Sequence, residues 1–235
     1  MTVPREALDA ALRRIEQSLL TMGGLVEKSL HSAVRSLLEQ DLNLARQVVE
    51  DDDIIDELEV ELERQGLQVI AMFQPVARDL RRIYCILRSI RDLERMGDLA
   101  SNIAETTIQI GDSPLIKPLI DIPHIAKHIE IMVQACLDSF VHQDAAKARE
   151  VLLMDHSVDE TYHFLHEELL GFVAEGGDSN RATQAVTLLF VARFLERIGD
   201  HATNIAESVV YYLTGERLMH ADSDDLEVGS ANSPE

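Results

Sequence analysis

Residues 93–105 read LERMGDLASNIAE, and residues 195–207 read LERIGDHATNIAE. At an offset of 102 positions, the windows 91–105 and 193–207 share 11 of 15 residues. The flanks differ, since residues 82–90 share one residue of nine with 184–192, and 106–113 share none of eight with 208–215. Helix packing tolerates exchange among similar apolar residues, so packing alone does not explain a repeated pattern of Glu, Asp and Asn. The repeat predicts two copies of one folding unit, each carrying a polar site.

The composition favours an aliphatic helical protein with an acidic surface. Of 235 residues, 46% are hydrophobic but only 4% are aromatic, and tryptophan is absent. The formal net charge of -21 disfavours binding to nucleic acid or to anionic lipid surfaces. Cys85 and Cys136 lie far apart in apolar segments and are expected to be buried thiols. Because residues 1–6 form no apolar segment and no run of about 18 apolar residues occurs, we expect a cytoplasmic protein without membrane insertion.

Apolar residues recur three and four positions apart over six long segments, the pattern of amphipathic helices. The expected helices span residues 5–40, 42–73, 75–111, 122–141, 145–173 and 180–213. Asp41, Asp121 and Asp144 are expected N-caps, and Gly111 and Gly215 are expected C-terminal stops. Short turns between long helices favour antiparallel neighbours.

The predicted fold class is therefore all-α, with two tandem three-helix bundles related by pseudo-twofold symmetry. The predicted boundaries are 1–112 for the first repeat and 122–215 for the second. Residues 113–121, which include Pro114 and Pro118, form the predicted linker. Residues 216–235 are polar, acidic and without periodicity, and we predict a disordered acidic tail.

The helix before each repeated motif carries a second acidic pair. At an offset of 103, residues 45–57 and 148–160 match at six of 13 positions. Asp52 and Asp56 thus recur as Asp155 and Asp159, four residues apart and on one helix face.

The two acidic pairs of each repeat are predicted to lie at the same level of an antiparallel hairpin. Positions 52 and 98, and likewise 56 and 94, average to 75, where Pro75 marks the turn. Positions 155 and 200, and likewise 159 and 196, average to 177.5, inside the glycine-rich turn at 176–178. Each hairpin should therefore bring four carboxylates together at the surface edge of the bundle.

Four ionised carboxylates repel one another, and protonation, arginine or a metal ion relieves the repulsion. Arg91 and Arg193, one turn before the glutamates, are the expected arginine partners. Hard oxygen ligands without cysteine suit magnesium, manganese, calcium or iron, and zinc is a further candidate. Gly97 and Gly199 permit close approach of a neighbouring backbone or ligand. The predicted metal ligands are Asp52, Asp56, Glu94, Asp98 and Asn102 in the first repeat, and Asp155, Asp159, Glu196, Asp200 and Asn204 in the second.

The sequence resembles the PhoU family of phosphate-uptake regulators over about residues 8–215. The likeness is carried by QPVARDLR at 74–81, DLERMGD at 92–98 and LERIGDHATNIAE at 195–207. It implies two three-helix bundles, a non-enzymatic and often dimeric accessory protein, and metal ions or clusters on paired acidic motifs. The match of Leu99 in the first copy to His201 in the second implies that the two sites differ in metal or occupancy.

The resemblance also implies a function and partners. Such proteins act as negative regulators of phosphate uptake and of the phosphate-starvation response. They couple the ATPase subunit of the high-affinity phosphate transporter to a sensor histidine kinase.

Three other interpretations are open from the residues alone. One is a helix-bundle phosphatase acting on an aspartyl-phosphate, with Asp98/Asn102 and Asp200/Asn204 orienting a water. Another is a di-iron carboxylate oxidase, although such sites need two Glu-x-x-His motifs and only Glu160-x-x-His163 is present. The third is metal binding by two histidine pairs with chelating spacing, His124/His128 and His163/His166. No third ligand is evident for either pair, so we interpret them as surface histidines.

Overall fold

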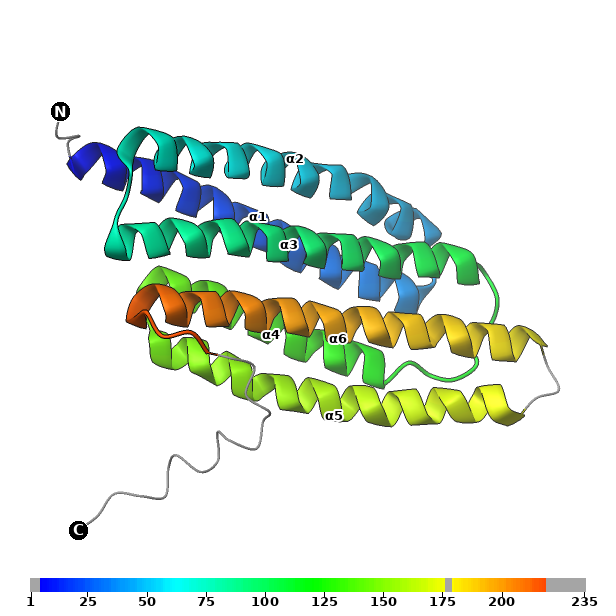
Figure 1. Ribbon diagram of the computed structural model, residues 1–235. Helices are drawn as coiled ribbons and strands as arrows, with labels where there is room; N and C mark the ends of the chain where they lie inside the picture. The colour runs from blue at the N-terminus through cyan, green and yellow to red at the C-terminus, as the bar shows by residue number, and fades with distance from the viewer. Residues whose placement is uncertain (1–4, 176–178, 219–235) are drawn as a thin grey trace, which may run out of the picture.

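The computed structural model describes residues 5–175 and 179–218 of the chain. Six long helices follow one another: α1 (Arg5–Glu39), α2 (Leu42–Phe73), α3 (Ala77–Ile110), α4 (Asp121–His142), α5 (Ala145–Glu175) and α6 (Ser179–Thr214). No strand occurs in the described ranges. The predicted all-α fold of two tandem three-helix bundles is confirmed, with α1–α3 in one bundle and α4–α6 in the other (Figure 1).

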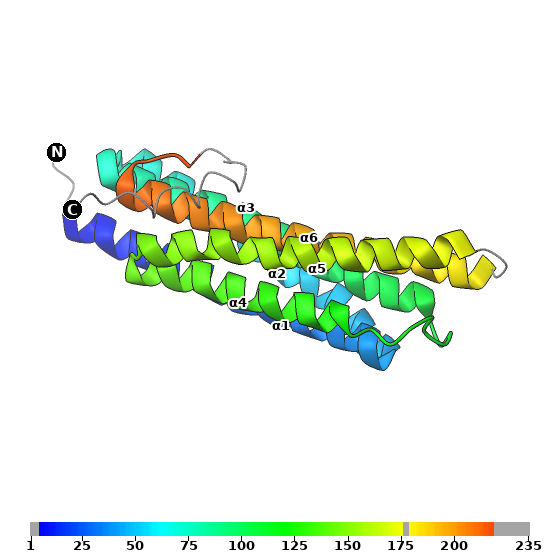
Figure 2. The same cartoon turned by 90° about the horizontal axis from the view of Figure 1, so that it is seen from below.

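The two bundles lie side by side, with α2 and α5 at the outer edges (Figure 1). Contacts between them run from α3 to α6 and from α1 to α4. Viewed from below, α3 and α6 form one layer and α1 and α4 form the other (Figure 2). The helices that carry the duplicated motif therefore meet at the centre of the molecule.

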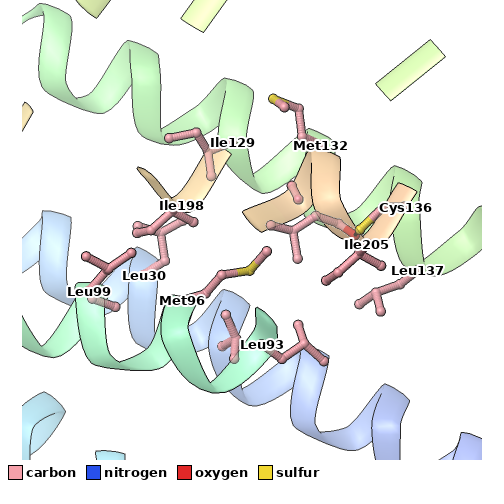
Figure 3. Close-up of a cluster of buried hydrophobic side chains, with 14 of the residues drawn as sticks. Leu30, Leu93, Met96, Leu99, Ile129, Met132, Cys136, Leu137, Ile198 and Ile205 are labelled. Atoms are coloured by element: carbon pink, nitrogen blue, oxygen red, sulfur yellow. Dashed lines mark hydrogen bonds between the residues drawn. The ribbon is translucent and has the colours of Figure 1, made fainter. Parts of the chain in front are cut away.

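A continuous aliphatic core joins the repeats across this junction. Leu30 of α1, Met96 of α3, Met132 of α4 and Ile198 of α6 are at most 1% exposed and pack in one cluster (Figure 3). Cys85 and Cys136 are buried in the same core as free thiols, as expected. Removal of this apolar surface from water, at about 25 cal/mol per Å², drives the two bundles together.

Most of the predicted helix ends are correct, and two are wrong. Asp41 accepts hydrogen bonds from the backbone N–H groups of residues 43 and 44, and Asp144 does so from residues 146 and 147. Asp121, in contrast, is no cap: it lies in the first turn of α4 and pairs with Lys117, 3.1 Å away. Helix α3 begins at Ala77, not at Pro75, because the left-handed conformation of Gln74 ends α2 and an extended Val76 precedes α3.

One buried polar contact breaks the symmetry between the repeats. His201 Nδ1 of α6 lies 2.9 Å from Asp92 Oδ1 of α3, and the amide of Asn204 donates to the same oxygen at 3.4 Å. The two side chains of the pair are only 17% and 10% exposed. In the other copy the corresponding positions hold Leu99 and Phe194, so the duplicated scaffold does not require a polar pair there.

We expect Asp92→Ala to destabilise the chain by about 1–3 kcal/mol, because the partners left behind are buried without an acceptor. Denaturant unfolding measures the loss, with Asp112→Ala, at an exposed site, as the matched control. The double variant Asp92→Leu/His201→Leu should cost less than Asp92→Ala, since it removes both polar partners. A double variant as unstable as the sum of its single changes would contradict the proposed coupling.

Candidate metal centres

The first acidic quartet consists of Asp52 and Asp56 on α2 and Glu94 and Asp98 on α3. One carboxylate oxygen from each of Asp56, Glu94 and Asp98 lies within 4.8 Å of the others. The antiparallel hairpin of α2 and α3 thus brings the acidic pairs to one level, as the averaging around position 75 predicts. In the parts of the chain that the structure describes, no other three acidic, histidine or cysteine residues come this close.

Gly97 lets α2 approach α3 closely at this quartet. A Cβ atom at Gly97 would lie 3.1 Å from Asp52 Oδ1 and 3.0 Å from Ile55 Cδ1. The second quartet repeats the device, since a Cβ at Gly199 would lie 3.2 Å from Asp155 Oδ1. Each glycine of the motif therefore makes room for the first aspartate of the neighbouring helix.

Burial and mutual repulsion raise the pKa values of the first quartet. Burial, followed by repulsion from Asp56 and Asp98, raises the pKa of Asp52 to about 6. Burial, followed by repulsion from Asp98, raises the pKa of Glu94 to about 7. Asp52 Oδ1 and Glu94 Oε2 are buried without a hydrogen-bond partner. Arg95 lies near the Glu94 oxygen, but Asp52 Oδ1 has no such ion pair, and a proton or a cation would satisfy it.

An arginine opposes this repulsion in the first quartet, but it is not Arg91. Arg95 Nη1 donates to Asp98 Oδ2 at 2.8 Å, and its Nε lies 3.3 Å from Glu94 Oε2. Arg91 is exposed and reaches neither carboxylate in an ion pair. The expectation for Arg91 is thus wrong, because the rotation of α3 turns this side chain toward the solvent.

The second quartet consists of Asp155 and Asp159 on α5 and Glu196 and Asp200 on α6. Burial, followed by repulsion from the other three members, raises the pKa of Asp155 to about 7. Burial also raises the pKa of Glu196, whose Oε2 has no hydrogen-bond partner. Arg193 donates to Glu196 Oε1 at 2.5 Å, as expected. No three carboxylate oxygens of the second quartet lie within 4.8 Å of one another, so it is looser than the first. It also has a different arginine, although both quartets contain a buried carboxylate oxygen without a hydrogen bond.

The two asparagines of the motif are placed differently. Asn204 directs its amide toward Asp92 at the contact between the repeats. Asn102 is half-buried on α3, one turn beyond Asp98. The ligand role of all ten predicted residues stays a prediction, which the donor chemistry of the quartets supports.

The histidine motifs do not add to these sites. Glu160 and His163 are exposed, and Phe164 beside them is 66% exposed, so this motif faces outward. A di-iron carboxylate site needs ligands that project into the bundle. His124 and His128 have ring centroids 4.5 Å apart, with no third ligand near them among the described residues.

Both repeats match a known domain family. The PhoU domain matches the chain twice, over residues 19–107 and 122–209. The phosphate-specific transport system accessory protein PhoU homolog of Pseudomonas aeruginosa is 39% identical over 218 residues, covering 92% of this chain and 88% of that protein. The phosphate-specific transport system accessory protein PhoU of Escherichia coli is 33% identical over 219 residues, covering 93% and 90%.

Solved structures agree with this assignment. The crystal structure of PhoU from Pseudomonas aeruginosa matches with a TM-score of 0.84 at 39% identity, covering 88% of this chain and 99% of that one. The phosphate transport system regulatory protein PhoU from Streptococcus pneumoniae matches with a TM-score of 0.82 at 29% identity, covering 90% and 99%. None of the described helices is long and apolar enough to cross a membrane. With its duplicated domain, its two three-helix bundles and these relatives, the chain belongs to the PhoU family.

Proposed function

We propose that this chain is a negative regulator of phosphate uptake and of the phosphate-starvation response. The observation that carries the proposal is the match to PhoU accessory proteins of phosphate-specific transport systems over about nine-tenths of both chains. In this proposal the chain acts as an adaptor, in dimeric form, between the ATPase subunit of a phosphate transporter and a sensor histidine kinase. It catalyses no reaction of its own.

We further propose that the two quartets bind metal ions. The chemistry of the residues fits, because each quartet offers only carboxylate oxygens, which suit magnesium, manganese or iron better than zinc. The buried oxygens of Asp52 and Glu196 without hydrogen-bond partners support the fit. A bound cation would neutralise the mutual repulsion of the carboxylates and tie α2 to α3 and α5 to α6.

Deletion of the gene tests the regulatory role. We expect deletion to raise alkaline phosphatase expression in phosphate-rich medium, because the kinase would no longer be restrained. A plasmid copy of the chain should restore repression, and a copy-number-matched empty plasmid is the control. Expression that stays low in phosphate-rich medium after deletion would contradict the proposal.

A phosphatase acting on an aspartyl-phosphate remains the second candidate, and the paired acid and amide on one helix motivate it. The hydrogen bond of Asn204 to Asp92 weighs against a water-orienting role for this amide in the second repeat. Release of phosphate from a phosphorylated response regulator by the purified chain would favour the phosphatase.

A further inference from the structure

A groove at one end of the molecule combines arginine and tyrosine side chains. It lies where α3 begins and α6 ends, and these ends are side by side (Figure 1). Its volume is about 250 Å³, and Tyr84, Arg88, Glu207, Tyr211 and Arg217 are among the residues that line it. The rings of Tyr84 and Tyr211 meet edge to face with centroids 5.7 Å apart, and the Arg217 guanidinium lies 5.5 Å from the Tyr211 ring centroid.

The lining is positively charged on a strongly acidic chain. Arg88 and Arg217 against Glu207 leave one net positive charge, since the other lining side chains are neutral. Arg81 and Arg78 contact Tyr212, next to the lining residue Tyr211: Arg81 donates to the Tyr212 carbonyl at 3.2 Å, and the Arg78 guanidinium lies 5.6 Å from the Tyr212 ring centroid. The whole chain has a formal charge of -21, so the lining of this groove differs in sign from the chain as a whole.

The bundle does not need these groups for its own packing. At the pseudo-symmetric positions of α6, Val186 and Phe190 replace Tyr84 and Arg88. Arg88 is exposed and makes no ion pair among the described residues, unlike Arg82, which pairs with Glu16 at 2.6 Å. An unpaired arginine beside two tyrosine rings is suited to receive a carboxylate from elsewhere.

We propose that the chain's own acidic segment 219–235 docks in this groove. Leu218 lines the groove, so the segment starts at its wall. The segment contains Asp222, Asp224, Asp225, Glu227 and Glu235 and no lysine or arginine. Asp222 and Glu227 are four and nine residues beyond Leu218, so they reach up to about 14 and 31 Å from it.

Docking within one chain needs little intrinsic affinity. A short covalent connection gives an effective concentration in the millimolar range, so weak ion pairs suffice. The contact is electrostatic and at the surface, and it therefore depends on salt.

A spin label on the full-length chain tests the proposal. Ser230→Cys supplies a thiol that reacts selectively, since Cys85 and Cys136 are buried and burial raises the pKa of Cys85 to about 12. We expect a nitroxide at residue 230 to broaden amide signals of residues 84–91 and 207–217, and not those of the quartets. Raising NaCl from about 0.1 M to about 1 M, which shortens the Debye length from about 10 Å to about 3 Å, should remove the broadening.

Charge reversal provides the matched controls. Arg88→Glu/Arg217→Glu should abolish the broadening, and Asp222→Lys/Asp224→Lys/Asp225→Lys in that background should restore it. Arg13→Glu, at an exposed position on α1, should leave it unchanged. Broadening that is absent, insensitive to the double reversal, or seen only between spin-labelled and isotope-labelled copies in a mixture would overturn the proposal. None of these outcomes depends on whether the chain represses phosphate uptake.

Discussion

Without metal, the chain should be more stable at pH 5 than at pH 8. The pKa values of Asp52, Glu94 and Asp155 rise to about 6, 7 and 7, so the folded state holds protons that the unfolded state has already released. Stability from these groups is therefore at its full value below about pH 4, where both states are protonated, and it is lost as the pH rises from there through the folded pKa values of about 6 to 7. Because solvent reaches the quartets and screens the repulsion, we expect each of these three carboxyl groups to lower the free energy of unfolding by about 1 kcal/mol at pH 8.

The resulting loss of about 3 kcal/mol corresponds to a melting temperature roughly 6–12 °C lower at pH 8 than at pH 5. Manganese at about 100 times its dissociation constant should restore about 2.7 kcal/mol at pH 8. Thermal unfolding in chelator, and then with manganese or magnesium added, measures both effects.

Neutral variants separate the two quartets. The metal response of a quartet is the rise in stability that manganese binding to it produces. Glu94→Gln/Asp98→Asn should lose the metal response of the first quartet, and Glu196→Gln/Asp200→Asn should lose that of the second. Both should be more stable than the parent chain at pH 8 in chelator, because each removes like charges. Glu57→Gln, at an exposed position of α2, is the control and should change neither property. Equal metal content by elemental analysis in the parent and in a variant with all four changes would contradict metal binding at these sites.

Gly97→Val should destabilise the first repeat and disable its quartet together. The new side chain would begin 3.0 Å from Ile55 Cδ1 and 3.1 Å from Asp52 Oδ1, so both must move. Overpacking of this kind costs about 1–3 kcal/mol. Displacement of Asp52 should also weaken the metal response of the first quartet and leave that of the second unchanged.

Two glycine substitutions calibrate this effect. Gly199→Ala should be milder, since its Cβ would meet Asp155 Oδ1 at 3.2 Å and the next atom, Val158 Cγ1, only at 3.6 Å. Gly24→Ala, with no atom within 4 Å of the new Cβ, should stabilise α1 by about 0.5–1 kcal/mol. Denaturant unfolding in chelator and manganese titration measure the two consequences separately. A Gly97→Val chain with unchanged stability and manganese binding would show that the close approach of α2 is unimportant.

Much of the fold was predictable because helices obey a local rule. The 3.6-residue periodicity placed all six helices, and the caps at Asp41 and Asp144 followed from side chains that reach the next backbone N–H groups. Asp121 is not a cap because α4 already begins at this residue, and its carboxylate pairs with Lys117 instead. The level of the acidic pairs also followed, because a hairpin fixes which residues are equally far from its turn.

The duplication, the helical class and the acidic residues that share a level in each hairpin can all be read from the order of the residues. Three features become visible only in the packed molecule: Arg95 and not Arg91 faces the first quartet, Asp92 meets His201, and Arg88 and Arg217 line one groove. This is because periodicity fixes the buried face of a helix only to within a wide sector. The final rotation of each helix and the docking of the two bundles depend on many packed side chains, often more than 100 positions apart in the chain.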